Sequence, residues 1–173
     1  VYVPEGKDLT FYMVRSKVTS DCCVDIINSW WSDNQHHYED VKKLVINLDN
    51  GPDQHSYRTQ FVKRIQEFSN QTKLEVHLAY YPPYHSKYNP IERVWGVLEQ
   101  HWNGSLLDSF STVFNFARTM TYNGVQPVVN IVKTVYHTGV KLTQQVMDTL
   151  ELRLDRYPKL EKYFVRITPF CPT

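Results

Sequence analysis

The sequence predicts an α/β fold, and three observations lead to this prediction. Apolar or alternating segments rich in strand-forming residues lie at 9–14, 44–48 and 74–80. Segments with the helical spacing of apolar residues, at 22–31 and 57–68, separate them. Strands and helices that alternate in this way are typical of a sheet covered by helices.

The composition is that of a globular protein. Hydrophobic residues make up 42% and aromatic residues 14% of the 173 residues, which excludes a disordered chain. Because the net charge is only +1, contact with a nucleic acid requires a local basic patch. We see no apolar run of about 18 residues and no signal peptide, so we expect a cytoplasmic protein outside the membrane. Cys22, Cys23 and Cys171 lack metal-binding spacing, and we expect reduced thiols.

The segment 44–48 is predicted to be a central strand that is buried on both faces. Its residues are apolar apart from Asn47, and the Asn-Gly-Pro turn at 50–52 ends it sharply. The segment 74–80 alternates strictly, and we expect it to run parallel to 44–48 in one mixed sheet. The strand at 9–14 is expected in the same sheet.

The helix that follows has clear start signals. Asn89 is a capping residue and Pro90 suits the first helical position. After Gly104 the pattern becomes mainly helical. We therefore predict a catalytic domain over 1–104 and a helical extension over 105–173 that packs on it. The helices expected in this extension cover 106–120, 127–136 and 144–154.

Two carboxylates stand out by their positions. Asp49 ends the 44–48 strand, and Glu92 lies in the first turn of the helix that Asn89 caps. Ligands in open α/β sheets bind beyond the carboxyl ends of strands. Carboxylate oxygens are the ligands that Mg²⁺ prefers. This arrangement predicts a divalent-metal site of the kind used in phosphodiester chemistry.

Each carboxylate also has a structural interpretation. Asp49 before Asn-Gly-Pro can form a turn through its side chain, and local features alone do not decide between the two roles. Glu92 lies three residues after Asn89 and fits a capping box, in which its side chain bonds back to the cap amide. A cap and a metal ligand can be the same residue at different times.

Other polar groups are weaker candidates. Candidate DNA contacts lie in and just after the loop before the Glu92 helix, because loops often carry function; they are His85, Ser86, Lys87 and Arg93. The tyrosines around Pro82-Pro83 either stack on bases or pack in the core. Lys63 and Arg64 are expected on a solvated helix face. His36, His37 and His55 are scattered and are expected at the surface rather than on zinc.

Two blocks of sequence carry a resemblance to a known family. Residues 45–52 read Val-Ile-Asn-Leu-Asp-Asn-Gly-Pro. Residues 81–95 read Tyr-Pro-Pro-Tyr-His-Ser-Lys-Tyr-Asn-Pro-Ile-Glu-Arg-Val-Trp. Together they resemble the DDE transposases of bacterial insertion sequences, closest to the group related to the mariner-like elements. The second block is a specific signal, and the resemblance covers residues 9–102.

This resemblance implies an RNase H-like fold in which three carboxylates hold two Mg²⁺ or Mn²⁺ ions. Asp49 matches the second carboxylate and Glu92 the third. The first belongs on the first strand of that fold; Asp8, Asp21 and Asp25 do not match it, and Asp21 is interpreted as a helix cap. The resemblance thus implies a chain that begins inside the catalytic domain, without the first strand or strands and without the usual DNA-binding helix-turn-helix.

The resemblance also implies an activity and partners. Such an enzyme cleaves a phosphodiester at the end of an insertion element and joins the freed 3′-hydroxyl to target DNA. Its partners are double-stranded DNA and, in the full-length protein, a second copy in a homodimer, and it is expected at the nucleoid. Two alternatives stay open: an RNase H-like nuclease without transposition, and a domesticated or truncated remnant that binds DNA or a partner without catalysis.

Overall fold

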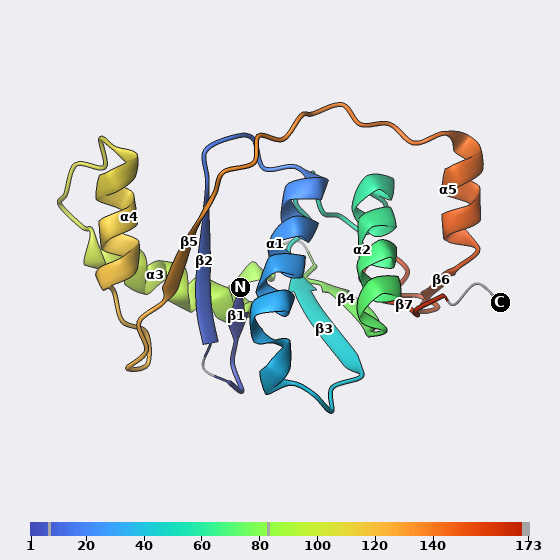
Figure 1. Ribbon diagram of the computed structural model, residues 1–173, viewed down its shortest axis with the longest axis horizontal. Helices are drawn as coiled ribbons and strands as arrows, with labels where there is room; N and C mark the ends of the chain where they lie inside the picture. Colours follow the sequence, from blue (N-terminus) through green and yellow to red (C-terminus); the bar gives the residue numbers. More distant parts are fainter. Residues whose placement is uncertain (7, 83, 171–173) are drawn as a thin grey trace. The chain divides into compact units, whose positions relative to one another are not determined.

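The structure, a computed structural model, has mixed α/β secondary structure (Figure 1). It describes residues 1–6, 8–82 and 84–170, apart from the side chain of Ser86. The chain divides into two compact units. The first unit comprises Val1–Ser16 and Ser86–Val135, and the second comprises Lys17–His85 and Tyr136–Thr173. The domain boundary predicted after residue 104 stays a prediction.

The second unit contains a mixed sheet with four described strands. These are β3 (Lys43–Leu48), β4 (Glu75–Tyr80), β6 (Leu154–Arg156) and β7 (Phe164–Ile167), in the order β3-β4-β7-β6. β3 and β4 are parallel, as the sequence predicts, and β7 is antiparallel to both of its neighbours. Because β7 comes from the last residues of the chain, the predicted helical extension also supplies strands to this sheet.

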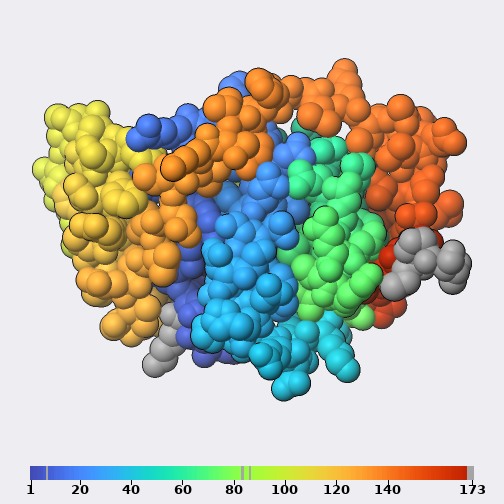
Figure 2. Space-filling model, viewed as in Figure 1, coloured from blue at the N-terminus to red at the C-terminus, as the bar shows by residue number. Residues whose placement is uncertain are grey.

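Helix packing covers this sheet through α2, which contacts β4 and β7 and on which α1 and α5 pack. The described helical elements of the unit are α1 (Ser20–Asn34), the short 3₁₀ helix η1 (Gln35–His37), α2 (Thr59–Thr72) and α5 (Gln144–Glu151). In Figure 2, α1 in blue and α2 in green pack side by side. Fully buried side chains of α2 and of the two inner strands form the core; they are Phe61, Ile65, Phe68, Val76, Leu78, Val165 and Ile167.

β3 is an edge strand, so its predicted central position and burial on both faces are wrong. β4 is its only neighbour in the described sheet. Its side chains alternate in exposure: Val45 is 51% exposed, whereas Leu48 is buried. One face of β3 therefore points away from the core, although the sequence of the strand shows little polar alternation.

The first unit has a smaller sheet and its own core. Its described elements are β1 (Tyr2–Val3), β2 (Asp8–Val14), the 3₁₀ helix η2 (Ser86–Tyr88), α3 (Pro90–His101), α4 (Phe110–Thr119) and β5 (Val128–Val132). The strand order is β1-β2-β5, with β1 antiparallel and β5 parallel to β2. Buried residues of β2, α3 and α4 pack together; they are Leu9, Phe11, Val94, Leu98, Ala117 and Met120.

Two predictions for this unit are wrong. The strand at 9–14 does not share a sheet with 44–48, since β2 belongs to the three-stranded sheet. The helix predicted over 127–136 is instead strand β5, which pairs with β2 in the register Thr10 to Val128. The β-branched residues of Val-Val-Asn-Ile-Val favour a pleated strand over a helix, and this preference decides the local structure.

The two thiols of α1 differ in burial: Cys22 is buried and Cys23 is half-buried. Cys22 and Cys23 are free cysteines. Burial raises the pKa of Cys23 to about 12, and Cys22, Asp53 and Asp49 contribute. Burial also raises the pKa of Cys22. Cys171 lies outside the described residues.

We predict that both thiols of α1 react slowly with iodoacetamide at pH 8. The expected rate in the folded protein is at least about tenfold below that in denaturant, since an unfolded cysteine has a pKa near 8.5. The raised pKa of Cys23 contributes stability to the folded state that is fully present below about pH 8.5. This contribution is lost as the pH rises from there through the folded pKa of about 12. Mass spectrometry of the individual cysteine peptides measures each rate, and equal rates in both states would contradict the prediction.

Candidate active site

Asp49 lies at the carboxyl end of the parallel strand pair. Leu48, the last residue of β3, is in register with Tyr80, the last residue of β4. The Tyr81 amide donates to the Leu48 carbonyl at 3.0 Å, which extends the ladder by one residue. The Asp49 side chain is exposed immediately beyond this point. This is the edge of an α/β sheet at which ligands bind.

The segment 49–58, here named the Asp49 loop, is held at its start by its own side chains. The Asn50 amide donates to the Tyr81 carbonyl at 3.1 Å. The Gln54 side-chain amide donates to Oδ1 of Asp49. The turn between them is closed by the Gln54 and His55 amides, which donate to the Gly51 carbonyl at 3.3 and 3.1 Å. The Asp49 carboxylate therefore contacts the far side of its own turn.

Three further side chains hold the main chain of the Asp49 loop. The Tyr80 hydroxyl donates to the Gln54 carbonyl at 2.8 Å. The Ser20 hydroxyl of α1 donates to the Asp53 carbonyl at 2.7 Å. Arg156 of β6 donates to the Ser56 carbonyl at 3.0 Å. The loop is thus fixed by α1, β4 and β6, all within the second unit.

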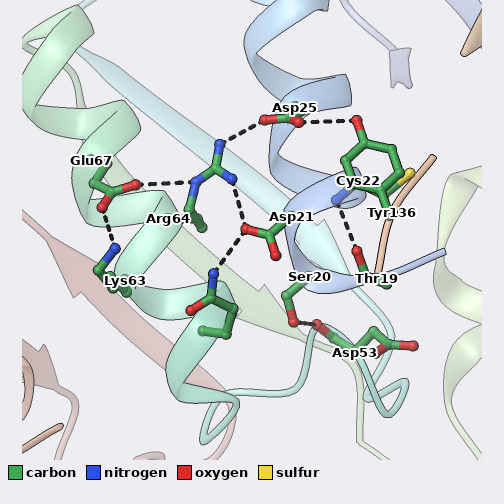
Figure 3. Close-up of polar contacts among 11 residues, drawn as sticks. Thr19, Ser20, Asp21, Cys22, Asp25, Asp53, Lys63, Arg64, Glu67 and Tyr136 are labelled. Atoms are coloured by element: carbon green, nitrogen blue, oxygen red, sulfur yellow. Dashed lines mark hydrogen bonds and ion pairs between the residues drawn. The ribbon is translucent and has the colours of Figure 1, made fainter. Parts of the chain in front are cut away.

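An ion-pair network joins α1 to α2 next to this loop (Figure 3). The Arg64 guanidinium contacts Asp21 at 2.7 Å, Asp25 at 2.6 Å and Glu67 at 3.1 Å. Burial lowers the pKa of Arg64, but hydrogen bonds to Asp21 and Asp25 outweigh it and raise the pKa overall. The Tyr136 hydroxyl donates to the other oxygen of Asp25 at 3.0 Å.

This network corrects two predictions. Arg64 is not on a solvated face, because its side chain is only 26% exposed and is paired with three carboxylates. Asp21 is not the cap of α1, since the Thr19 hydroxyl accepts from the Cys22 amide at 3.3 Å and occupies that position. Asp21 and Asp25 are therefore both committed to Arg64.

Glu92 lies in the first turn of α3, in the first unit. The predicted start of this helix is confirmed: Asn89 is the cap and accepts from the Ile91 amide at 3.3 Å, and Pro90 begins the helix. The Glu92 side chain is exposed. Among the described residues, no hydrogen bond joins its carboxylate to the Asn89 amide, so the capping box is not formed. The carboxylate remains open to solvent at the helix N-terminus, where a negative charge is stabilised.

The candidate DNA contacts fall in both units. Lys87 and Arg93 are exposed in the first unit, and the Lys87 ammonium lies 5.2 Å from the centre of the Tyr88 ring. His85 is exposed in the second unit and donates its amide to the Pro82 carbonyl at 3.1 Å. Of Ser86, only the backbone at the start of η2 is described.

The tyrosines near Pro82 differ in burial, and two of the histidines are exposed. Tyr80 is buried, and burial raises the pKa of its hydroxyl, whereas Tyr84 is 97% exposed. Tyr80 therefore packs in the core, and its hydroxyl also donates to the Gln54 carbonyl. His36 and His37 are exposed in η1, as predicted. Within the described parts of the chain, no three His, Cys, Asp or Glu side chains form a group that could hold a metal ion.

Asp49 belongs to the second unit and Glu92 to the first. Each has an exposed carboxylate at the end of a strand or the start of a helix, as the sequence predicts. That the two carboxylates converge on one metal site stays a prediction.

A comparison with protein families identifies one family that matches the chain. The family described as Rhodopirellula transposase DDE domain matches residues 1–169. The chain belongs to this family. No curated protein and no solved structure matches the chain. The resemblance to DDE transposases is therefore confirmed for nearly the whole length of this DDE domain.

The sequence did not single out the groups that surround Asp49 in the DDE domain. Gln54 lies five residues after Asp49, but a glutamine in a turn carries no signal by itself. Ser20 and Arg156 reach the loop from distant positions in the chain. A weak signal existed for the network, because Asp21 and Asp25 are four residues apart and lie on one face of a helix.

None of the described helices is long and apolar enough to cross a membrane.

Proposed function

We propose that this DDE domain is part of a transposase that cleaves DNA at the ends of an insertion element and joins them to a target. The supporting observation is the exposed Asp49 carboxylate at the carboxyl end of the parallel pair β3–β4, in a chain of this family. Glu92 is the second proposed catalytic carboxylate. Asp49 would hold the metal ions, and Glu92 would hold metal or orient water.

The donors suit Mg²⁺ or Mn²⁺. Both are carboxylates, both are exposed, and Mg²⁺ is commonly held by one or two carboxylates together with water and substrate oxygens. One oxygen of Asp49 accepts from Gln54, which leaves the other for a ligand. When bound, two such ions stabilise the attacking and leaving oxygens of phosphodiester chemistry. The side chains themselves would hold the ions and orient the reacting groups, because phosphoryl transfer depends mainly on positioning and charge.

The finer features of the proposal follow from the resemblance. We propose an RNase H-like fold related to the mariner-like group, with catalytic residues in 1–104 and an extension over 105–173. Double-stranded DNA is the substrate at the nucleoid, and the full-length protein acts as a homodimer. His85, Ser86, Lys87 and Arg93 are its candidate DNA contacts. The parallel β3–β4 pair supports the fold proposal.

The test is a strand-transfer assay with the full-length protein. Labelled DNA carrying an element end and an unlabelled target are incubated with Mg²⁺, and products are separated by size. Joined products are expected. Cleavage without joining would favour an RNase H-like nuclease, and binding without cleavage would favour a non-catalytic remnant.

We also predict that the 173-residue chain by itself shows no metal-dependent cleavage. Its motifs match two of the three carboxylates, and two carboxylates do not fix two ions about 4 Å apart. Asp21 and Asp25 are paired with Arg64 rather than free to replace the first carboxylate. Incubation with element-end DNA in Mg²⁺ or Mn²⁺ is the measurement. Cleavage that is lost on Asp49→Asn would contradict the prediction and show that another group completes the site.

A further inference from the structure

The side chain that contacts the Asp49 carboxylate is Gln54. Its amide nitrogen donates to Oδ1 of Asp49 across the turn. The contact lies directly over Gly51: a Cβ added at Gly51 would stand 3.4 Å from Oδ1 of Asp49 and 3.7 Å from Nε2 of Gln54. The bond engages Oδ1 of Asp49.

Gln54 is itself held by a buried group. The Tyr80 hydroxyl donates to the Gln54 carbonyl at 2.8 Å, and Tyr80 is only 5% exposed. Since Tyr80 is the last residue of β4, Gln54 is tied to the sheet as well as to the turn at Gly51. The Ser20 hydroxyl, also buried, fixes the preceding carbonyl of Asp53 at 2.7 Å. A continuous path of bonds therefore runs from β4 through Gln54 to the carboxylate.

We propose that Gln54 is a positioning residue that orients the Asp49 carboxylate for a divalent cation. This inference rests on the proposed function. A ligating carboxylate that is free to rotate loses part of its affinity, and a hydrogen bond to one oxygen fixes the plane in which the other is presented. Partners of this kind change metal affinity or activity by about 10–100-fold when they are removed.

The experiment compares matched variants of the full-length protein by titration with Mn²⁺ alone, followed by electron paramagnetic resonance. Gln54→Met keeps the length of the side chain but removes the donor, and Mn²⁺ affinity is expected to fall about tenfold. Tyr80→Phe removes the hydroxyl that holds Gln54 and should act in the same direction. Gln71→Met, at an exposed position of α2, is the control and should match the wild type.

A second readout separates orientation from general loosening of the loop. In the joining assay, Gln54→Met should raise the Mg²⁺ concentration needed for half-maximal rate and leave the maximal rate nearly unchanged. A lower maximal rate with an unchanged Mg²⁺ requirement would overturn the role of Gln54. So would wild-type Mn²⁺ affinity in Gln54→Met.

The variant Asp49→Asn distinguishes the two proposals. If it weakens Mn²⁺ binding while Gln54→Met does not, the inference on Gln54 fails and the proposed function stands. If Asp49→Asn changes neither Mn²⁺ binding nor joining, the proposed function fails and the inference fails with it.

Discussion

Asp49→Asn and Glu92→Gln are each expected to abolish DNA cleavage and joining by the full-length protein. Loss of a metal-binding charge removes several kcal/mol of transition-state stabilisation, which corresponds to a rate reduction of about a hundredfold or more. The fold should tolerate both changes. Asp49 is exposed, and an asparagine oxygen can still accept from Gln54. Glu92 is exposed as well, so each variant should change the free energy of unfolding by less than about 1 kcal/mol.

The measurement combines the joining assay with DNA binding and thermal unfolding. Asp40→Asn and Glu99→Gln are matched controls, because they remove the same charge from exposed positions of the same two units. Both controls should retain activity. Near-normal strand transfer in Mg²⁺ by either variant would refute the assignment of that residue.

The double variant tests whether the two carboxylates act at one site. Residues that act as a unit are strongly non-additive: once one is lost, removal of the other has little further effect. Asp49→Asn combined with Glu92→Gln should therefore lose little more activity than either single change. Measured with a sensitive assay for residual cleavage, independent and multiplying losses would contradict convergence of the two carboxylates.

The sequence predicted the end of β3 and the start of α3 better than it predicted the arrangement of the sheets. The start of α3 follows from Asn89 and Pro90 because cap and first-turn preferences are local. The edge position of β3 could not be predicted, since the number of neighbours of a strand depends on partners elsewhere in the chain. The segment of β5 is predicted as a helix because short apolar runs are ambiguous in periodicity. Its β-branched residues were the better signal.

Long-range pairing explains why the network around Arg64 was missed. Arg64 and Asp21 are 43 residues apart, and only the packing of α2 on α1 brings them together. Lys63 and Arg64 are adjacent and carry the same charge. The local sequence pattern therefore predicts that both side chains are exposed to solvent. Their surroundings differ in the structure: the Arg64 side chain is 26% exposed with three carboxylate partners, and Lys63 is 35% exposed with one.

Arg64→Met is expected to destabilise the protein by about 2 kcal/mol, between the values typical of exposed and of buried ion pairs. The methionine retains much of the packing but leaves Asp21, Asp25 and Glu67 close together without their shared cation. Lys63→Met removes one exposed pair with Glu67 and should change the free energy of unfolding by about 0.5 kcal/mol or less. Urea unfolding monitored by tryptophan fluorescence gives both values, and the slopes should agree if the transition is unchanged.

A double-mutant cycle assigns this loss to the network. Arg64→Met and Asp21→Asn should couple by about 1–2 kcal/mol, because each removes the partner of the other. Additive losses would show that the arginine acts through packing alone.

Coupling at Arg64 also bears on the site, since Asp21 is next to Ser20, whose hydroxyl holds the Asp49 loop at Asp53. Loss of the pairing between α1 and α2 should therefore increase hydrogen exchange in residues 49–58, and unchanged exchange there would show that β4 and β6 suffice to hold the loop.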